Sequence, residues 1–150
     1  MDITDSILYG KTEEAVAVVT YFDPEGQRTY MVYGLKKKKT QKLRVRVNPG
    51  DVLKIKYTMV QSGGMKIIDV IRCQLPSDLN YAKKVYGTIQ KVGNKNVASL
   101  LCGNIKAHIS PNLVSKYRIA NGDNVESLIV YDYDKKKDSW SWVSITINKK

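Results

Sequence analysis

The stretch that decides the fold runs from Ile105 to Asp132 and reads IKAHISPNLVSKYRIANGDNVESLIVYD. It opens on five residues whose alternation predicts a half-buried strand. Lys106 and His108 would share the outer face of this strand, while the residues around them point into a core. A helix signal, a glycine turn and a second apolar run follow. This order of elements is typical of a small, mostly β domain.

The helix signal is the dipeptide Ser110-Pro111. Proline is favoured at the first position of a helix, so we expect one or two helical turns near Pro111–Tyr117. The sequence Asn121-Gly122-Asp123 then predicts a turn, because glycine and its polar neighbours tolerate turn geometry. A strand from Val125 to Tyr133 would follow this turn.

The first half of the chain contains a similar pattern. Arg46–Val52 (RVNPGDV) resembles Arg118–Val125 (RIANGDNV), and both lead through a Gly-Asp turn into a strand-like run. Tyr9-Gly10 likewise resembles Tyr86-Gly87. The separation is 72 positions for the Gly-Asp pairs and 77 for the Tyr-Gly pairs. The halves therefore echo one architecture without being a clean sequence duplication.

Many short apolar runs, separated by turns rich in glycine and proline, predict an all-β protein. The segment 74–84 breaks the strand pattern with proline, serine, aspartate and asparagine. We therefore expect two domains, residues 1–75 and residues 83–150. Each is small but long enough to bury one modest core.

The charge of the chain favours polyanionic partners. Among 150 residues, 25 are lysine or arginine and 14 are aspartate or glutamate, a formal net charge of +11. Nucleic acid, the ribosome or an anionic membrane would attract such a protein; the alternative is charge that only serves solubility. Residues 1–10 lack a secretory signal, and no apolar run approaches the roughly 20 residues of a membrane span. We expect a cytoplasmic protein without a membrane partner.

The sequence lacks the residue clusters of the common enzymes and metal sites. His108 is the single histidine, and Cys73 and Cys102 lie far apart, so a zinc site is not expected. The glycine pair Gly63-Gly64 is too short to cradle a phosphate and predicts a hairpin turn. We expect no catalytic residue, no metal and no cofactor.

The densest cationic segment is Lys36 to Lys39. We expect a flexible loop there that contacts phosphates without reading sequence. Lys42, Arg44 and Arg46 would continue the charge along a strand at residues 43–47, opposite its aliphatic side chains. The alternative is a solvated loop that keeps strand edges from associating.

Two further groups of lysines have different expected roles. Alternation in residues 53–57 places Lys54 and Lys56 on an outer strand face. Lys135–Lys137 is flanked by aspartates, which favours the tip of a hairpin, with nucleic-acid binding as the alternative.

Alternation in the last strand predicts that Trp140, Trp142 and Ser144 face outward. The side chains expected to pack inward are Val143, Ile145 and Ile147. With Tyr131 and Tyr133, the two indoles could form a platform on which bases stack, each stack contributing roughly 1–3 kcal/mol. The alternative is that the indoles pack against the partner barrel.

Residues 86–133 resemble bacterial translation initiation factor 1 and its eukaryotic and archaeal relative, factor 1A. The motifs that carry the resemblance are Tyr86-Gly87-Thr88-Ile89, Val92-Gly93-Asn94, Cys102-Gly103-Asn104, Ala107-His108-Ile109-Ser110, Lys116-Tyr117-Arg118-Ile119, Gly122-Asp123 and Tyr131-Asp132. The resemblance implies an S1-type OB fold that binds structured or single-stranded RNA, in that family on the small ribosomal subunit. The residues that fall where the family meets RNA are Lys106, His108, Lys116, Tyr117 and Arg118.

We therefore expect an all-β protein of two tandem small OB-type five-stranded barrels without enzymatic activity. Its expected partners are RNA or single-stranded DNA, and the ribosome or another protein subunit are further candidates. Two alternatives stay open: a single-stranded DNA-binding protein, and a protein–protein adaptor in a nucleic-acid-processing complex. The predicted nucleic-acid-binding residues are Lys36, Lys37, Lys38, Lys39, Lys42, Arg44, Arg46, Lys54, Lys56, Lys106, His108, Lys116, Tyr117, Arg118, Trp140 and Trp142.

Overall fold

The computed structural model describes residues 12–61, 63–91, 93 and 97–149. These residues form two compact units. The first comprises the chain up to Gly34 together with Lys39–Leu75, and the second comprises Leu35–Lys38 and the chain from Pro76 onward. Apart from one short helix, the regular structure in the described residues is β, which confirms the predicted class. In this part of the chain no helix is both long and apolar enough to cross a membrane.

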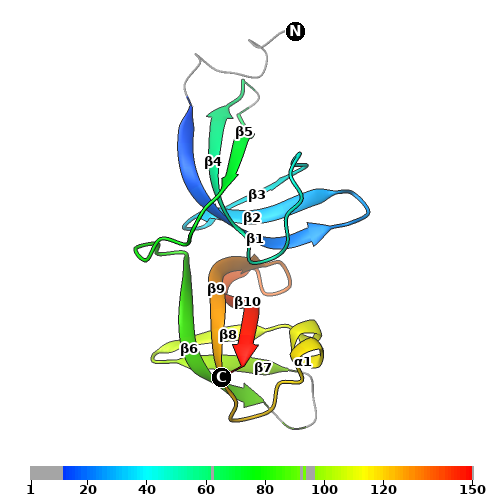
Figure 1. Cartoon of the computed structure of the whole chain (residues 1–150), viewed down its shortest axis with the longest axis vertical. Coiled ribbons are helices and arrows are strands. Elements are labelled where there is room, and N and C mark those ends of the chain that lie inside the picture. Colours follow the sequence, from blue (N-terminus) through cyan, green and yellow to red (C-terminus); the bar gives the residue numbers. More distant parts are fainter. Residues whose placement is uncertain (1–11, 62, 92, 94–96, 150) are drawn as a thin grey trace. The chain divides into compact units, whose positions relative to one another are not determined.

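The first unit is built on a five-stranded sheet in the order β3-β2-β1-β4-β5 (Figure 1), of which only the first two residues of β3 are grouped with the second unit. Strand β1 is central and pairs antiparallel with β2 and β4, and β5 pairs antiparallel with β4. The strands are β1 (Glu13–Asp23), β2 (Arg28–Gly34), β3 (Lys37–Gln41), β4 (Val52–Met59) and β5 (Met65–Arg72).

Strand β4 confirms the predicted alternation. Leu53 and Ile55 are fully buried, while Lys54 and Lys56 are exposed between and beyond them. The buried residues that pack with this strand are Ala17, Val19, Met31, Val47, Met65 and Ile67. Because they come from three other strands and from the loop before β4, the sheet curls around one apolar core.

The second unit is a closed barrel in the order β10-β8-β7-β6-β9 (Figure 1). A parallel contact between β8 and β10, at His108 and Val143, closes it, and the other strand pairs are antiparallel. The elements are β6 (Ala82–Lys91), β7 (Ala98–Cys102), β8 (Ile105–Ile109), α1 (Pro111–Tyr117), β9 (Asn124–Asp134) and β10 (Ser139–Lys149).

Helix α1 lies between the third and fourth strands of this barrel, where the sequence predicts it. The Ser110 hydroxyl caps its first turn by accepting from the Leu113 N–H at 3.3 Å. Arg118 ends the helix in the left-handed conformation, with φ at 50°. Val114 points inward and is buried. The helix thus covers part of the barrel core.

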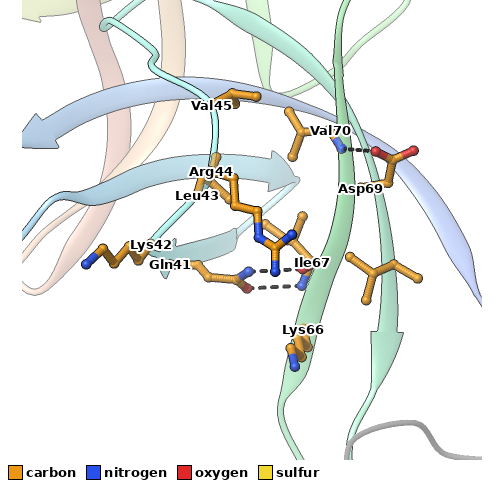
Figure 2. Close-up of a pocket in the computed structure, with 10 residues that line it drawn as sticks. Gln41, Lys42, Leu43, Arg44, Val45, Lys66, Ile67, Asp69 and Val70 are labelled. Atoms are coloured by element: carbon orange, nitrogen blue, oxygen red, sulfur yellow. Dashed lines mark hydrogen bonds between the residues drawn. The ribbon is translucent and has the colours of Figure 1, made fainter. Parts of the chain in front are cut away.

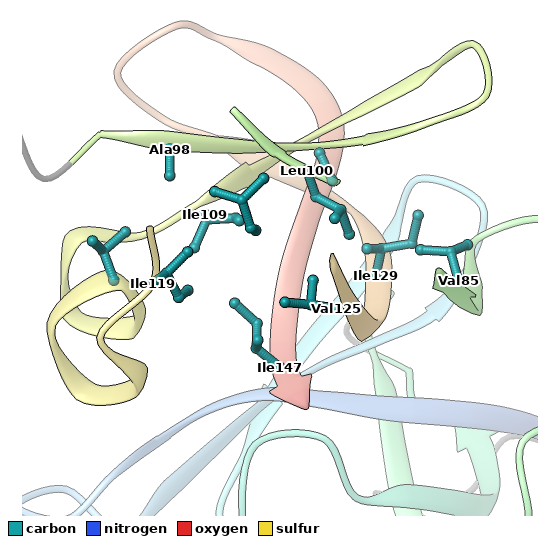
Figure 3. Packing of buried hydrophobic residues seen from close by; sticks show 11 residues of the cluster. Val85, Ala98, Leu100, Ile109, Ile119, Val125, Ile129 and Ile147 are labelled. Atoms are coloured by element: carbon teal, nitrogen blue, oxygen red, sulfur yellow. The ribbon is translucent and has the colours of Figure 1, made fainter. Parts of the chain in front are cut away.

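The barrel core is apolar and drawn from all five strands and the helix (Figure 3). Gly87 lies where β6 changes partner from β9 to β7. A Cβ atom there would lie 2.5 Å from the Leu101 carbonyl oxygen and 2.8 Å from Leu100 Cδ1. Only glycine fits this close approach without moving the backbone.

The Gly-Asp turn of the first unit ties the start of β4 to β1. The Asp51 carboxylate accepts from the Asn48 N–H at 2.9 Å. The Gly50 N–H donates to the Val19 carbonyl at 2.8 Å, and the Val19 N–H donates to the Asp51 carbonyl at 2.9 Å. Gly50 has φ at 96°, which favours glycine.

The second unit repeats this turn. The Asp123 carboxylate accepts from the Ala120 N–H at 2.9 Å. Gly122 N–H donates to the Ile89 carbonyl and Ile89 N–H donates to the Asp123 carbonyl, both at 2.8 Å. The predicted equivalence of the two Gly-Asp turns is confirmed.

The matching strand registers identify the counterpart of Gly87. Gly87 pairs with Val125 and Ala17 pairs with Leu53, so Ala17 occupies the corresponding place in the first unit. Both are small residues at a crowded position. Tyr9-Gly10, predicted to match Tyr86-Gly87, lies outside the described residues.

A brace at the end of the last strand also recurs. In the first unit the Arg72 guanidinium donates to the Arg46 carbonyl and lies 3.8 Å from the Asp51 carboxylate. In the second unit the Lys149 ammonium donates to the Arg118 carbonyl at 2.7 Å and lies 3.7 Å from the carboxylate of the Gly-Asp turn. In both units a cation at the chain's exit holds the turn before the fourth strand.

A bulge at the same register interrupts the last strand of each unit. It leaves Ile68 as the extra residue of β5 and Ile145 as the extra residue of β10. The bulge reverses the faces of β10. Ser144 is 2% exposed and Trp142 packs against the core. The prediction that Trp142 and Ser144 face outward, with Val143 and Ile145 inward, is therefore wrong.

The first unit differs from the second in how its edge strands meet. Where β8 pairs with β10 in the barrel, side chains link β3 to β5 (Figure 2). The Gln41 carboxamide donates to the Ile67 carbonyl and accepts from the Ile67 N–H, both at 3.0 Å. Lys39 Nζ donates to the Met65 carbonyl at 2.7 Å. A backbone-closed barrel is thus shown for the second unit, and a curled sheet for the first.

The strand predicted at residues 43–47 is wrong. The strand is Lys37–Gln41, since a tight turn at Leu35-Lys36, with Lys36 φ at 57°, lets the lysines pair with β2. The expected lysine loop is therefore a hairpin. After this hairpin, residues 42–49 are not in a strand, so their side chains do not alternate regularly between core and solvent. Val45 is 38% exposed while Val47 is buried.

Candidate nucleic-acid interface

Strands β7 and β8 present a polar, cationic outer face. Lys106 and His108 are exposed on β8, as predicted. They pair across to Leu101 and Ser99 on β7, so two rows of side chains cross the strands. On the far side of β7, strand β6 extends these rows with Thr88 and Gln90, both exposed. None of these six side chains is negatively charged, so the face suits an anionic ligand.

The end of helix α1 carries a second cationic group. Lys116 and Arg118 are exposed, and Tyr117 is half-buried against the barrel core. The Lys116 ammonium lies 5.3 Å from the centre of the Tyr117 ring, within cation–π range. The Arg118 carbonyl is held by Lys149, so its backbone is fixed while its guanidinium is in solvent. This group closes the helix that follows β8 in the chain.

Strand β6 adds two residues that were not predicted as site residues. Lys84 is exposed, and the Tyr86 ring is 63% exposed on the same outer face. A hydrogen bond to Glu126, together with that carboxylate's charge, raises the pKa of Tyr86. The alternation of Lys84, Tyr86 and Thr88 would have placed them outward.

The four aromatic residues of the β9–β10 hairpin contact one another. Tyr131 lies with its ring centre 5.5 Å from that of Trp142 and 6.3 Å from that of Trp140. Tyr133 lies 5.6 Å from Trp140. The Lys83 ammonium covers the Trp142 ring at 5.1 Å. These rings pack as cross-strand pairs, and Trp142 has little free face for a base.

The tip of this hairpin is closed by aspartates, as predicted. The Asp134 carboxylate accepts from the Lys136 N–H at 2.9 Å and from the Lys137 N–H at 3.4 Å. The Tyr133 hydroxyl donates to the Asp138 carboxylate, and this bond is the main reason that the pKa of Tyr133 is raised. The aspartates therefore fix the turn that carries the lysine run through its backbone and through Tyr133.

The predicted cations of the first unit fall into separate environments. Lys39 is used to hold β5, as described above. Lys54 Nζ lies 3.1 Å from the Glu14 carboxylate, and Lys56 is the cross-strand neighbour of Glu14 and Asp69. Carboxylates lie beside both lysines in the sheet, so the outer face of β4 is a weak candidate for binding phosphate. Lys38 Nζ lies 2.9 Å from the Asp132 carboxylate. The remaining predicted cations in this region are exposed at Lys36 and Lys37 and along residues 42–46.

The described residues contain no cluster of three or more histidine, cysteine, aspartate or glutamate side chains that could hold a metal ion. The geometry supplies cations, polar groups and aromatic surface on a rigid barrel. Such a surface can bind an anionic polymer.

Comparison with known families agrees with the barrel. Residues 83–147 match the family described as S1/CSD-like domain 2 of the TOTE conflict systems. No curated protein matches the chain. The match covers β6 to β10 and supports an S1/OB-type fold for the second unit, whereas the specific resemblance to the initiation factors is not part of this finding.

Proposed function

We propose that the chain is a non-catalytic nucleic-acid-binding protein that holds RNA or single-stranded DNA on the outer face of β7 and β8. The observation that carries the proposal is the pair Lys106 and His108, exposed side by side on one strand of an S1/OB-type barrel. In OB folds this sheet face and the adjoining loops bind oligonucleotides.

The physical basis is chiefly electrostatic. Each lysine or arginine that contacts a phosphate releases counterions, which supplies affinity without sequence preference. Lys106 would provide such a contact, and Lys116 and Arg118 would extend it past the end of β8. The exposed ring of Tyr86 offers a surface on which a base can stack.

We also propose that the first unit is an OB-type barrel, in tandem with the closed barrel of the second unit. Its strands follow the same order as those of the second unit, with the same Gly-Asp turn, the same bulge and the same terminal brace. Its seam is closed by Gln41 instead of by a backbone ladder.

The family match supports a biological setting, and we infer a nucleic-acid-binding role within TOTE conflict systems. A cytoplasmic location and the absence of enzymatic activity are further parts of the proposal. A ribosomal role rests on the initiation-factor resemblance alone. Between RNA and single-stranded DNA the decisive test is competition of matched oligomers at two salt concentrations, since a protein distinguishes the two through the 2′-hydroxyl.

Replacing Lys106 with glutamine tests the proposed face. We expect Lys106→Gln to flatten the log–log salt dependence of oligonucleotide affinity by about 0.7. The loss of affinity caused by Lys106→Gln should therefore be about five-fold larger at 0.1 M salt than at 1 M salt. Lys106→Arg preserves the charge and should restore the slope. If Lys106→Gln binds with an unchanged slope and unchanged melting temperature, the β7–β8 face is not the interface.

A further inference from the structure

The seam of the first unit opens into a groove. It runs between residues 41–45 and β5 and has a volume of about 520 Å³. Figure 2 shows Gln41 bridging the two sides, with the Arg44 side chain reaching along the groove and Lys42 pointing away from β5. The volume falls within the range of about 300–1,000 Å³ that is usual for ligand sites.

The groove arises from the way the sheet fails to close. Gln41 satisfies the N–H and carbonyl of Ile67, and the chain then leaves β3 instead of continuing along β5. The following segment therefore stands off from β5. Apolar walls remain on both sides, with Val45 38% and Ile68 43% exposed.

The charge of the groove is positive. Arg44 and Lys66 are exposed on opposite walls, and neither forms an ion pair within the described part of the chain. The one acidic side chain in the lining is Asp69, which accepts the Val70 N–H at 3.0 Å and neighbours Lys56 across the strand pair. The carboxylate is thus engaged away from both groove cations.

We infer that this groove is a second binding site for a single nucleic-acid strand, with Arg44 and Lys66 contacting successive phosphates. Arginine suits a phosphate because its planar guanidinium can donate two parallel hydrogen bonds. The exposed Val45 and Ile68 would lie against sugar and base. The negative charge of the nucleic-acid strand complements Arg44 and Lys66, whereas an apolar peptide would leave these two cations unpaired. The inference rests on the proposed function, since it adds a second site for the same ligand.

The test compares two double variants of the full chain. Arg44→Gln with Lys66→Gln removes both groove charges, and Arg44→Lys with Lys66→Arg preserves them. The probe is a labelled oligouridylate of about 16 nucleotides, the upper site size of one OB fold. We expect the glutamine pair to flatten the salt slope by about 1.4. The loss of affinity that it causes should therefore be about 25-fold larger at 0.1 M salt than at 1 M salt. The charge-preserving pair should retain the slope.

The outcomes separate the groove from the proposed face. If Lys106→Gln flattens the slope and the groove variant does not, the groove inference is overturned and the proposed function stands. If the groove variant alone flattens it, the groove is upheld and the β7–β8 face fails. If the unaltered chain does not bind the oligomer, both fail.

A second measurement covers the case in which the groove variant does not fold. A 4-thiouridine oligomer is photo-crosslinked to the unaltered chain, and the attached peptides are mapped. Crosslinks at residues 42–45 or 66–70 support the groove. Crosslinks confined to the second unit overturn it.

Discussion

Replacing Gln41 with alanine tests whether one side chain closes the first unit. Its carboxamide makes two hydrogen bonds of 3.0 Å to Ile67, whose residue is 5% exposed. A net hydrogen bond contributes about 0.5–1.5 kcal/mol, and a buried group left unpaired costs about 1–3 kcal/mol. We expect Gln41→Ala to lower the local unfolding free energy by about 2–3 kcal/mol.

Native-state hydrogen exchange at the Ile67 amide measures this loss directly. The two tryptophans, Trp140 and Trp142, lie in the second unit, so their fluorescence does not report on this seam. Exchange at Ile67 should become about 30- to 150-fold faster, at tenfold per 1.4 kcal/mol. The matched control is Gln90→Ala, an exposed glutamine on β6, which should change stability by less than about 0.5 kcal/mol. Equal protection of the Ile67 amide in the variant and the unaltered chain would refute the closure by Gln41.

Three further substitutions follow from the packing and charges. Gly87→Ala should destabilise the barrel by about 1–3 kcal/mol, because its Cβ would meet the Leu101 carbonyl; unchanged thermal unfolding would contradict this. Trp142→Ala should cost about 2–4 kcal/mol of stability, since the ring packs on the core, and loss of oligomer affinity without loss of stability would contradict that packing. Lys54→Gln with Lys56→Gln should change the salt slope less than Lys106→Gln does, as measured by titration, because Glu14 and Asp69 lie beside these lysines and disfavour a phosphate there.

The parts of the fold that could be predicted are those governed by local rules. Alternation placed Lys106 and His108 outward, and proline after Ser110 placed helix α1. The Gly-Asp turns could be predicted because glycine tolerates positive φ and aspartate accepts backbone hydrogen bonds in turns, and both residue types can be read from the sequence.

The errors arose where pairing, and not pattern, decides the structure. In β10 the alternation is real, but the bulge at Ile145 shifts it by one residue, which turned the expected outward face of Trp142 toward the core. Residues 43–47 alternate as a strand would, yet they form no strand pairing with any part of the chain that the structure describes. A side chain that replaces a backbone ladder, as Gln41 does, has no sequence signature.

The exposure of the candidate site residues was predicted in part. Lys106 and His108 on β8, and Lys116 and Arg118 at the end of α1, are exposed as expected. From the sequence, Lys39 and Lys54 were expected to be free for phosphate. In the fold, Lys39 donates to the Met65 carbonyl and Lys54 lies beside the Glu14 carboxylate. Lys66 was not among the predicted binding residues. It lines a groove that forms because residues 42–45 do not pair with β5, and no sequence pattern predicts that separation.

The salt dependence of oligonucleotide binding by the full chain tests the proposed function most directly. The five cations that would contact phosphates are Arg44, Lys66, Lys106, Lys116 and Arg118. At about 0.7 per contact to a single strand, we predict a log–log slope of about −3.5 between affinity and salt concentration. A slope between 0 and about −0.7, equivalent to at most one phosphate contact, would contradict nucleic-acid binding as the function and would favour a protein–protein adaptor.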